Sequence, residues 1–302
     1  MRVALAGCGR WGRNILRDLL ALGCEVTVAD PDARARAHAA QVGADTVGYV
    51  NDLPDCGGIV IATPTSTHAD VIGQMLPRGV PTFVEKPMCC SVTDARELTE
   101  RANGRLFVMD KWRYHPGVEE LRRIRESGEL GPALGMHLTQ VGWGCPHLDV
   151  DVTWILLPHC LSILDEVLGC LPPAVSSFAE HLDGQAIALR GVLGSDPWAT
   201  VEVSARSPEK RREFRLHCVG GVAWLDGRWH NQIRIARGPA GLNSDAADVE
   251  TRAVPADLPL LRELRVFIEH LNGGPPPITG AAEGALAVER IHELRTLAGL
   301  PA

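Results

Sequence analysis

The chain has 302 residues, of which 45% are hydrophobic, with a net charge of −7 and a mean hydropathy of +0.01. This length allows two domains with ordinary cores. The acidic balance argues against a nucleic-acid partner. The one basic cluster, Lys210-Arg211-Arg212, is short and is predicted to be a solvated turn. No stretch approaches the roughly 20 apolar residues of a membrane span, and Met1-Arg2 leads into a predicted strand rather than a signal peptide. Nine cysteines without CxxC spacing suit reduced thiols. We therefore expect a cytoplasmic protein with no membrane partner.

The elements predicted in the first third of the chain alternate between strands and helices. Apolar strand runs lie at 2–6, 26–29, 58–62, 81–84 and 105–109, and helical patterns lie at 12–22, 32–42, 66–78 and 91–103. Such alternation is typical of an α/β fold with a parallel, doubly wound sheet, the Rossmann arrangement.

The pattern changes after about residue 115. A helix at 116–127 is followed by strand-like segments at 133–143, 174–180, 185–193, 198–206, 213–219 and 222–225, with an apolar helix at 156–169. Turn residues join these strands, which predicts an α+β domain with a large, open and mostly antiparallel sheet. We expect domains at 1–115 and 116–302, with a C-terminal helix at 280–299 that packs back near the first domain.

A glycine motif, Gly7-x-Gly9-x-x-Gly12, directly follows the first strand and begins the first helix. Gly7 would permit a tight turn, Gly9 would let the backbone approach a pyrophosphate, and Gly12 would let the helix pack close to the sheet. The helix N-terminus would offer N–H groups to the phosphates. We therefore expect this turn, with Arg10 and Trp11 inside it, to bind a dinucleotide; a purely structural glycine turn is the alternative.

Asp30 ends the second strand, where a carboxylate would accept hydrogen bonds from an adenosine ribose. The same charge would repel a 2′-phosphate, which favours NAD over NADP. Arg34 and Arg36 follow closely, and with Arg10 they could instead bind that phosphate. NADP therefore remains the alternative cofactor.

The third strand runs into Ala62-Thr63-Pro64-Thr65-Ser66-Thr67-His68. Ligands bind at the carboxyl ends of strands in such sheets, so the expected cofactor contacts here are Ala62, Thr63, Pro64, Thr65 and His68. Ser66 or Thr67 equally suits a helix N-cap. A histidine one step into a helix, such as His68, is more often structural.

The fourth strand ends in Glu85-Lys86-Pro87. The proline biases Lys86 toward an extended backbone, from which its ammonium could hydrogen-bond a substrate oxygen and stabilise developing negative charge. Glu85, Lys86 and Pro87 are all expected beside the cofactor. The alternative is a surface ion pair.

Two segments further along the chain are candidates for substrate binding. Lys111-Trp112-Arg113-Tyr114-His115-Pro116 lies at the predicted domain junction, where Arg113 and Tyr114 could line a cleft or merely join the domains. His159 lies at the predicted start of the apolar helix. It is a candidate proton donor or acceptor, although a lone histidine in such a helix is usually a core residue.

Cysteine and histidine recur at Cys145-Pro146-His147 and His159-Cys160, but this spacing fits no compact zinc site, so we expect no metal. Asp149 and Asp151 are turn residues first and possible site carboxylates second. Of the two, Asp151 is retained as a candidate substrate contact.

Taken together, these motifs resemble the Gfo/Idh/MocA family, which includes glucose-fructose oxidoreductase and inositol dehydrogenase. The similar segments occur in order over about the first 170 residues: GCGRWGRN, ATPTSTHAD, EKP, WRYHP and PHCLSIL. The resemblance implies a Rossmann domain followed by an open α/β domain, assembled as a homodimer or homotetramer. It implies hydride transfer between NAD or NADP and the secondary alcohol or ketone of a sugar, cyclitol or related polyol. By matching motif, Lys86 corresponds to the lysine that contacts the reacting hydroxyl and the nicotinamide region, and His159 to the histidine with acid/base duty.

One departure concerns the apolar helix. Similar sequences often carry W-D-L-A-P-H-D, whereas this chain has Ile155 and Cys160 at the two aspartate positions. Isoleucine can neither orient an imidazole nor stabilise its protonated form, so the usual proton relay lacks its carboxylate unless Asp149 or Asp151 replaces it. We predict an NAD(P)-dependent oxidoreductase acting on a small polar substrate, which could be an imine or an atypical ketone. The alternative is a catalytically silent dinucleotide-binding regulatory or scaffold protein.

Overall fold

The computed structural model describes residues 1–145, 149–227, 231–238 and 248–301. The chain divides into two compact units, one made of Met1–Lys111 with Leu258–Val288 and the other of Trp112–Asp257 with Glu289–Ala302. This division differs from the predicted boundary after residue 115, chiefly because residues 258–288 belong to the first unit. Within the described part of the chain, no helix combines the length and apolar character needed to cross a membrane.

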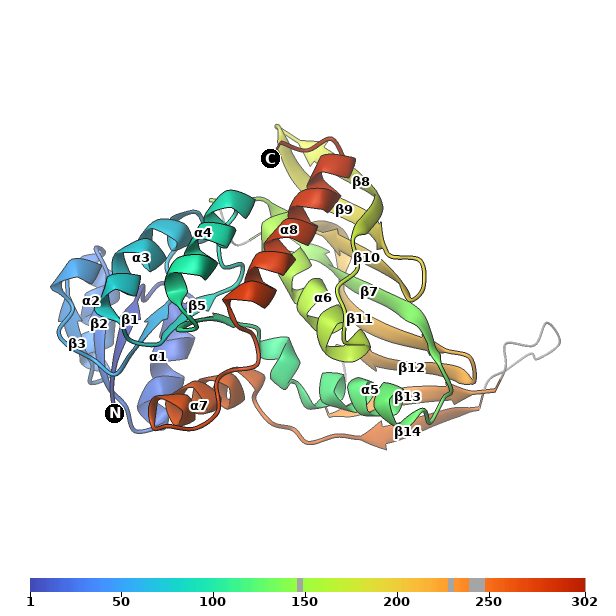
Figure 1. Cartoon of the computed structure of the whole chain (residues 1–302), viewed down its shortest axis with the longest axis horizontal. Helices are drawn as coiled ribbons and strands as arrows, with labels where there is room; N and C mark the ends of the chain where they lie inside the picture. The colour runs from blue at the N-terminus through green and yellow to red at the C-terminus, as the bar shows by residue number, and fades with distance from the viewer. Residues whose placement is uncertain (146–148, 228–230, 239–247, 302) are drawn as a thin grey trace. The chain divides into compact units, whose positions relative to one another are not determined.

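The first unit contains a six-stranded, fully parallel sheet in the order β3-β2-β1-β4-β5-β6 (Figure 1). Its strands are β1 (Arg2–Ala6), β2 (Glu25–Ala29), β3 (Asp45–Val47), β4 (Gly58–Ile61), β5 (Thr82–Glu85) and β6 (Leu106–Met109). Its helices are α1 (Gly12–Ala21), α2 (Ala33–Gln41), α3 (His68–Met75), α4 (Val92–Ala102) and α7 (Pro259–Leu271). This confirms the predicted Rossmann arrangement. Successive strands are added to one side of β1 up to β3 and to its other side from β4 onward. Dinucleotides bind at this switch point between β1 and β4 in such folds.

Helices cover both faces of this sheet. Figure 1 shows α3 and α4 on one face and α1 with α7 on the other. Helix α1 forms because Ile15, Leu16 and Leu19 recur on one side and are fully buried against the strands. Helix α7 adds Phe267 to the same core, with its ring centroid 4.9 Å from that of Phe83 on β5.

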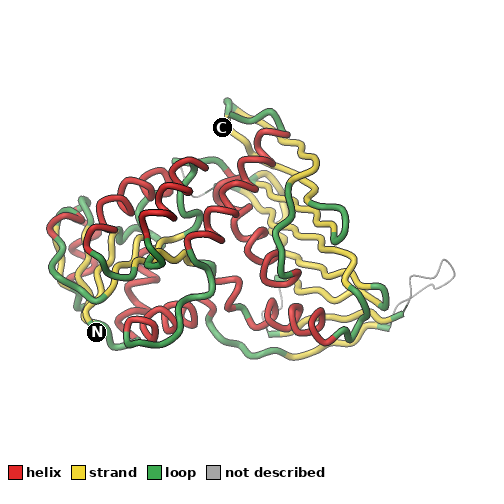
Figure 2. Tube along the Cα trace, in the orientation of Figure 1, coloured by secondary structure: helices red, strands yellow, loops and turns green. Residues whose placement is uncertain are grey.

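The second unit contains an eight-stranded sheet in the order β14-β13-β12-β11-β7-β10-β9-β8. Its strands are β7 (Ala133–Trp143), β8 (Ala174–Leu182), β9 (Gln185–Leu193), β10 (Trp198–Ser204), β11 (Arg206–Cys218), β12 (Gly221–Asp226), β13 (Gln232–Arg237) and β14 (Val249–Ala253). Only the β7–β10 pair is parallel, so the predicted mostly antiparallel sheet is confirmed. Figure 2 shows the strands as a continuous array with helices along one face.

The helices on this face are α5 (Pro116–Ser127) and α6 (Val152–Leu168), together with residues of α8 (Ala281–Leu297) from Glu289 onward. Almost every residue of α6 is buried. Asp151 caps its N-terminus by accepting a bond from the Thr153 backbone N–H, and Gly169 ends it with a φ of 73°.

Three local predictions are wrong. Lys210-Arg211-Arg212 does not form a turn but lies within β11, where a register shift between Arg206 and Arg211 accommodates it. Helix α6 begins at Val152 rather than at 156, because the Asp151 cap starts it and it continues through Pro158. His159 therefore lies in the middle of the helix and not at its start.

Candidate functional site

The glycine turn between β1 and α1 fits a pyrophosphate, and each glycine is required for a different reason. Gly7 has a φ of +91°, and a Cβ on it would lie 2.6 Å from the Ala62 carbonyl oxygen. A Cβ on Gly12 would lie 2.3 Å from the Gly7 carbonyl oxygen, so α1 could not pack there. A Cβ on Gly9 would meet no atom within 4 Å. The space above Gly9 is thus open beside the N-terminus of α1, as phosphate binding by backbone N–H groups requires.

This difference predicts opposite effects for two matched substitutions. Gly12→Ala should lower the free energy of unfolding by about 1–3 kcal/mol, since backbone atoms must shift to admit the methyl group. Gly9→Ala should change it by less than about 0.5 kcal/mol, yet weaken NADH binding about tenfold or more by filling the space a phosphate would occupy. Thermal unfolding and NADH titration of both variants measure this. If Gly9→Ala binds NADH normally, the turn does not hold the pyrophosphate.

Asp30 lies at the carboxyl end of β2 and is buried, with both carboxylate oxygens accepting backbone hydrogen bonds. Oδ2 accepts from the Cys8 N–H at 2.7 Å, and Oδ1 accepts from the Asp32 N–H at 2.8 Å. Each oxygen keeps a second lone pair for a ribose hydroxyl. Arg36 donates to the Asp30 and Pro31 carbonyl oxygens at 2.7 and 2.9 Å, so its guanidinium already supports this turn. Arg34 remains exposed.

The loop after β4 is fixed by His68 rather than by a hydroxyl cap. The hydroxyl of Thr67 donates to the Pro64 carbonyl at 2.7 Å and lies 2.9 Å from Thr63 Oγ1, instead of capping α3. The His68 ring is 1% exposed, with Nδ1 2.8 Å from the Pro87 carbonyl and Nε2 3.0 Å from the Thr63 carbonyl. His68 therefore ties the loop after β4 to the segment after β5, which is a structural role.

Glu85 ends β5 and Lys86 follows it; the two do not form a surface ion pair, because Glu85 is buried. The Trp11 indole N–H donates to Glu85 Oε1, which connects the glycine turn to the end of β5. Burial raises the pKa of Glu85, while the charges of Lys86 and Lys111 and the Trp11 hydrogen bond oppose this shift. Lys86 is half-buried beside it and is followed by Pro87.

In the second unit, His159 is half-buried on α6 and lies against aromatic rings. The Trp112 ring contacts it edge-on, with centroids 6.5 Å apart, and also stacks on His115 at 5.1 Å. Ile155, one turn before His159, is buried, so no carboxylate occupies that position. Burial raises the pKa of the neighbouring Cys160 thiol to about 12, opposed by a hydrogen bond with Gln140, so Cys160 does not supply the missing negative charge.

The remaining candidate substrate contacts are engaged within the second unit. Arg113 donates to Glu166 at 2.8 Å and to Asp165 at 3.1 Å, and Tyr114 is 4% exposed. Asp151 caps α6 and accepts from Arg295 Nη1 at 2.9 and 2.7 Å. Asp151 thus has a structural use and does not replace the carboxylate missing at position 155.

Of Cys145 and His147, the second lies outside the described residues. Among the residues that the structure describes, no three His, Cys, Asp or Glu side chains are grouped as metal ligands.

Comparison with known proteins also indicates an NAD-binding Rossmann fold in the first unit. A family model described as an oxidoreductase family with an NAD-binding Rossmann fold, GFO_IDH_MocA, matches residues 1–108. The scyllo-inositol 2-dehydrogenase (NAD(+)) of Bacillus subtilis is 29% identical over 320 residues, which cover 96% of this chain and 91% of that protein. Over residues 1–108 the chain is thus similar to the Gfo/Idh/MocA family.

Other curated proteins match over shorter regions. The rhizopine catabolism protein MocA of Rhizobium meliloti is 33% identical over 43% of this chain and 44% of its own length. The inositol 2-dehydrogenase 2 of Saccharopolyspora erythraea is 29% identical over 48% of this chain and 47% of its own length. The chain therefore spans less than half the length of these curated relatives.

Solved structures extend the fold likeness to the whole chain. A UDP-N-acetylglucosamine 3-dehydrogenase from Acidithiobacillus ferrooxidans superposes with a TM-score of 0.85 at 22% identity, covering 98% of this chain and 97% of that one. A levoglucosan dehydrogenase in complex with NADH and L-sorbose superposes with a TM-score of 0.86 at 14% identity, covering 99% and 96%. At these identities the likeness establishes the fold alone.

Two buried charged residues are not among the candidates predicted from the sequence. Glu263 on α7 is 1% exposed, and Arg295 on α8 is 5% exposed. Each is a charged residue inside an apolar helical pattern. The pattern 259–271, with Pro259 at its first position, could have been recognised as a helix, and Glu263 would then have fallen on its buried side.

Proposed function

We propose that the chain is an NAD-dependent oxidoreductase that transfers hydride between nicotinamide and the secondary alcohol or ketone of a sugar, cyclitol or related polyol. The observation that carries the proposal is the turn from Gly7 to Gly12, with open space at Gly9 and the buried Asp30 carboxylate beside it. Nicotinamide supplies the hydride acceptor or donor when bound. The inositol dehydrogenases among the relatives support a polyol substrate.

Lys86 is proposed to bind and polarise the reacting oxygen. The chain has only three lysines among its 30 lysines and arginines, so it uses arginine almost everywhere that a positive charge alone suffices. A lysine is a compact donor with three N–H bonds, suited to an alcohol or ketone oxygen. Its ammonium would stabilise negative charge that develops on that oxygen.

His159 is proposed to accept the proton of the alcohol during oxidation and to return it during reduction. The Trp112 ring contacts the imidazole edge-on, and isoleucine at position 155 offers it no carboxylate. Because no negative charge favours the imidazolium at that position, a substrate that brings its own basic nitrogen, such as an imine, is a candidate beside polyols.

Cofactor choice is proposed to favour NAD because of the Asp30 charge. Asp30→Ala should weaken NADH binding about tenfold, through loss of the ribose contacts and of the bonds to the turn, while NADPH binding weakens less or improves. Asp32→Ala is the matched control, because it removes a neighbouring exposed carboxylate that caps α2 instead. Equal losses for both cofactors in Asp30→Ala would show that Asp30 does not discriminate.

The proposed activity is tested by following nicotinamide absorbance with NAD and a panel of polyols, and with NADH and the matching ketones and cyclic imines. We expect turnover with at least one class. Tight NADH binding without turnover on any panel member would favour the catalytically silent regulatory or scaffold protein.

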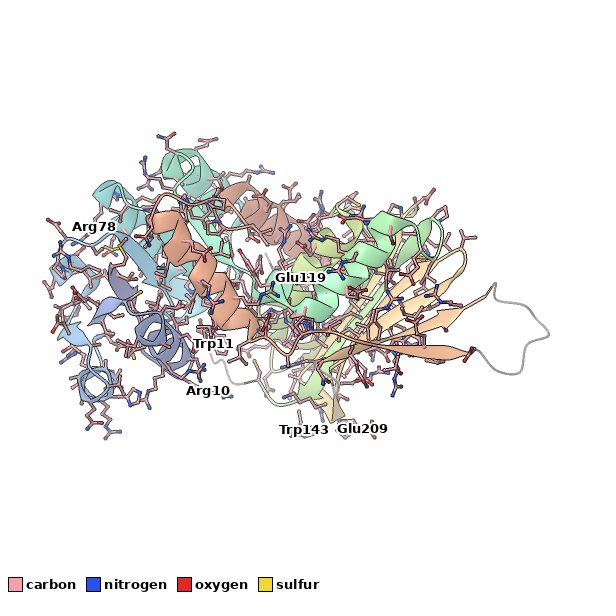
Figure 3. All side chains as sticks on the ribbon, turned by 90° about the horizontal axis from the view of Figure 1, so that it is seen from below. Arg10, Trp11, Arg78, Glu119, Trp143 and Glu209 are labelled. Carbon is pink, nitrogen blue, oxygen red and sulfur yellow. The ribbon has the colours of Figure 1, made fainter. Side chains whose placement is uncertain are left out.

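Family resemblance also leads us to propose a homodimer or homotetramer. Trp143 on β7 and Phe178 on β8 are 74% and 60% exposed, and Figure 3 shows Trp143 projecting from the second unit. Large exposed apolar side chains of this kind often mark protein contacts. Light scattering on the purified chain gives the number of subunits.

A further inference from the structure

Five polar or aromatic side chains of the first unit, three of them buried, interact with one another at the glycine turn and the end of β5, and the reaction described above does not use them as a group. They are Trp11 in the turn, Glu85 at the end of β5, Asp110 and Lys111 after β6, and Glu263 on α7. All five belong to the first unit. We call them the α7 network.

Trp11 is the centre of this network. Its indole N–H donates to Glu85, and the Lys111 ammonium lies 4.2 Å from its ring centroid, a cation–π distance. Trp11 is also the residue before Gly12, the first residue of α1. Figure 3 shows it near the end of α7, while Arg10 points outward. The position of its ring is therefore linked to the helix terminus that would face the phosphates.

Glu263 is the member of the network whose chemistry is least expected. It is 1% exposed, and its Oε2 has no hydrogen-bond partner among the residues that the structure describes. An ionised carboxylate in such a place would cost several kcal/mol. Burial, and then the charges of Glu85 and Asp110, raise the pKa of Glu263 well above its ordinary value, and Lys111 opposes the shift only in part.

The two glutamates thus differ in their surroundings. Glu85 has a hydrogen-bond donor in Trp11 and two nearby ammonium groups, which favour its charged form. Glu263 has two carboxylates near it, which favour its neutral form. A neutral carboxyl carries one O–H, and that group can donate a hydrogen bond to a neighbouring carboxylate where an ionised one would repel it.

We propose that Glu263 is a positioning residue that acts as a neutral hydrogen-bond donor in the α7 network, holding Glu85 and through it Trp11 and the phosphate-binding turn. Lys86 directly follows Glu85, so the same network would also fix the position of Lys86 after the end of β5. The expected effect of Glu263 on NADH binding rests on the proposed function. The expected effect of Glu263 on the position of Trp11 does not depend on the proposed function.

The test uses the full chain with two substitutions of similar size, Glu263→Gln and Glu263→Met. Glutamine keeps a neutral donor, whereas methionine keeps only the volume. The emission of Trp11 is isolated in each case by subtracting the spectrum of the same protein carrying Trp11→Phe, without cofactor. NADH affinity is then measured by titration.

We expect Glu263→Gln to leave the Trp11 emission and the NADH dissociation constant within about twofold of the parent. We expect Glu263→Met to shift the Trp11 emission to longer wavelength and to weaken NADH binding about tenfold, the size of a lost buried hydrogen bond. A parent-like Glu263→Met protein would reduce Glu263 to a space-filling role. Equal impairment of both variants would mean that its negative charge is what matters. Either result overturns the proposal.

Two further variants serve as a control and as a second test. Leu264→Met alters the buried side of α7 without touching a polar group and should leave Trp11 emission unchanged. If Glu263→Met does not fold, Trp11→Phe tests the network from its half-exposed end, and its NADH affinity should fall about tenfold. Normal NADH binding by Trp11→Phe would overturn the proposal. If the unmodified chain did not bind NADH at all, the proposed function would be refuted, and the Trp11 emission would still test the role of Glu263.

Discussion

Lys86→Ala is expected to lower kcat by about 10²–10⁴-fold while leaving the NADH dissociation constant within about threefold. The ammonium would act on the oxygen whose charge changes during hydride transfer, so its removal raises the barrier rather than weakening cofactor binding. The glycine turn and Asp30, which would carry most of the cofactor affinity, are unchanged in this variant. Steady-state kinetics and NADH titration on the same preparation give both quantities.

Two control variants sharpen this experiment. Lys86→Arg keeps the charge but replaces a compact ammonium with a planar guanidinium, and should recover little activity. Lys210→Ala removes an exposed lysine on β11 of the second unit and should be fully active. If Lys86→Ala retained its turnover, or lost turnover only in proportion to NADH binding, Lys86 would have no direct role in the chemistry.

Arg295→Met is expected to lower the free energy of unfolding by about 3–5 kcal/mol, the usual cost of breaking a buried ion pair. The guanidinium is 5% exposed, donates to both oxygens of Asp151 and to the Pro301 carbonyl, and lies 5.2 Å from the Trp154 ring. Its loss would leave the Asp151 carboxylate uncompensated at the start of α6. Denaturant unfolding measures the change.

The double variant Arg295→Met/Asp151→Asn separates charge from packing. Asparagine retains an N-cap oxygen without a charge, so the double variant should be more stable than Arg295→Met alone. A double variant less stable than the single one would show that Arg295 acts through packing on Trp154 rather than by neutralising Asp151.

The parallel sheet was predictable because its signals are local. Each buried strand is a short apolar run, and the glycine motif lies between the first strand and the first helix. Helix α7 was not predicted as part of this unit, since its membership depends on contacts between Phe267 and Phe83, which lie far apart in the sequence. Strand β11 was not predicted at Lys210, because a run of charged residues is typical of a turn; here the pairing with β7 is irregular between Arg206 and Arg211 and then continues through Arg211 and Arg212.

The candidate site could be predicted in part for the same reason. Residue types and spacing identified the glycines, Asp30 and Lys86, but partners across the fold decide what a charged side chain does. Asp151 and Arg113 were plausible substrate contacts by position, yet Arg295, Asp165 and Glu166 engage them. The surroundings of Glu263 could not be predicted from the sequence, because the helix packs this residue into the core and the nearby Glu85 and Asp110 come from other elements.

The central claim is hydride transfer to a polyol carbon, and isotope labelling tests it most directly. Reduction of the best ketone from the panel with NADH deuterated at C4 should place deuterium on the new carbinol carbon, from one face of nicotinamide only. Product mass spectrometry and proton NMR would detect it. Deuterium found in solvent instead of on that carbon, or product formed without NADH oxidation, would contradict the account.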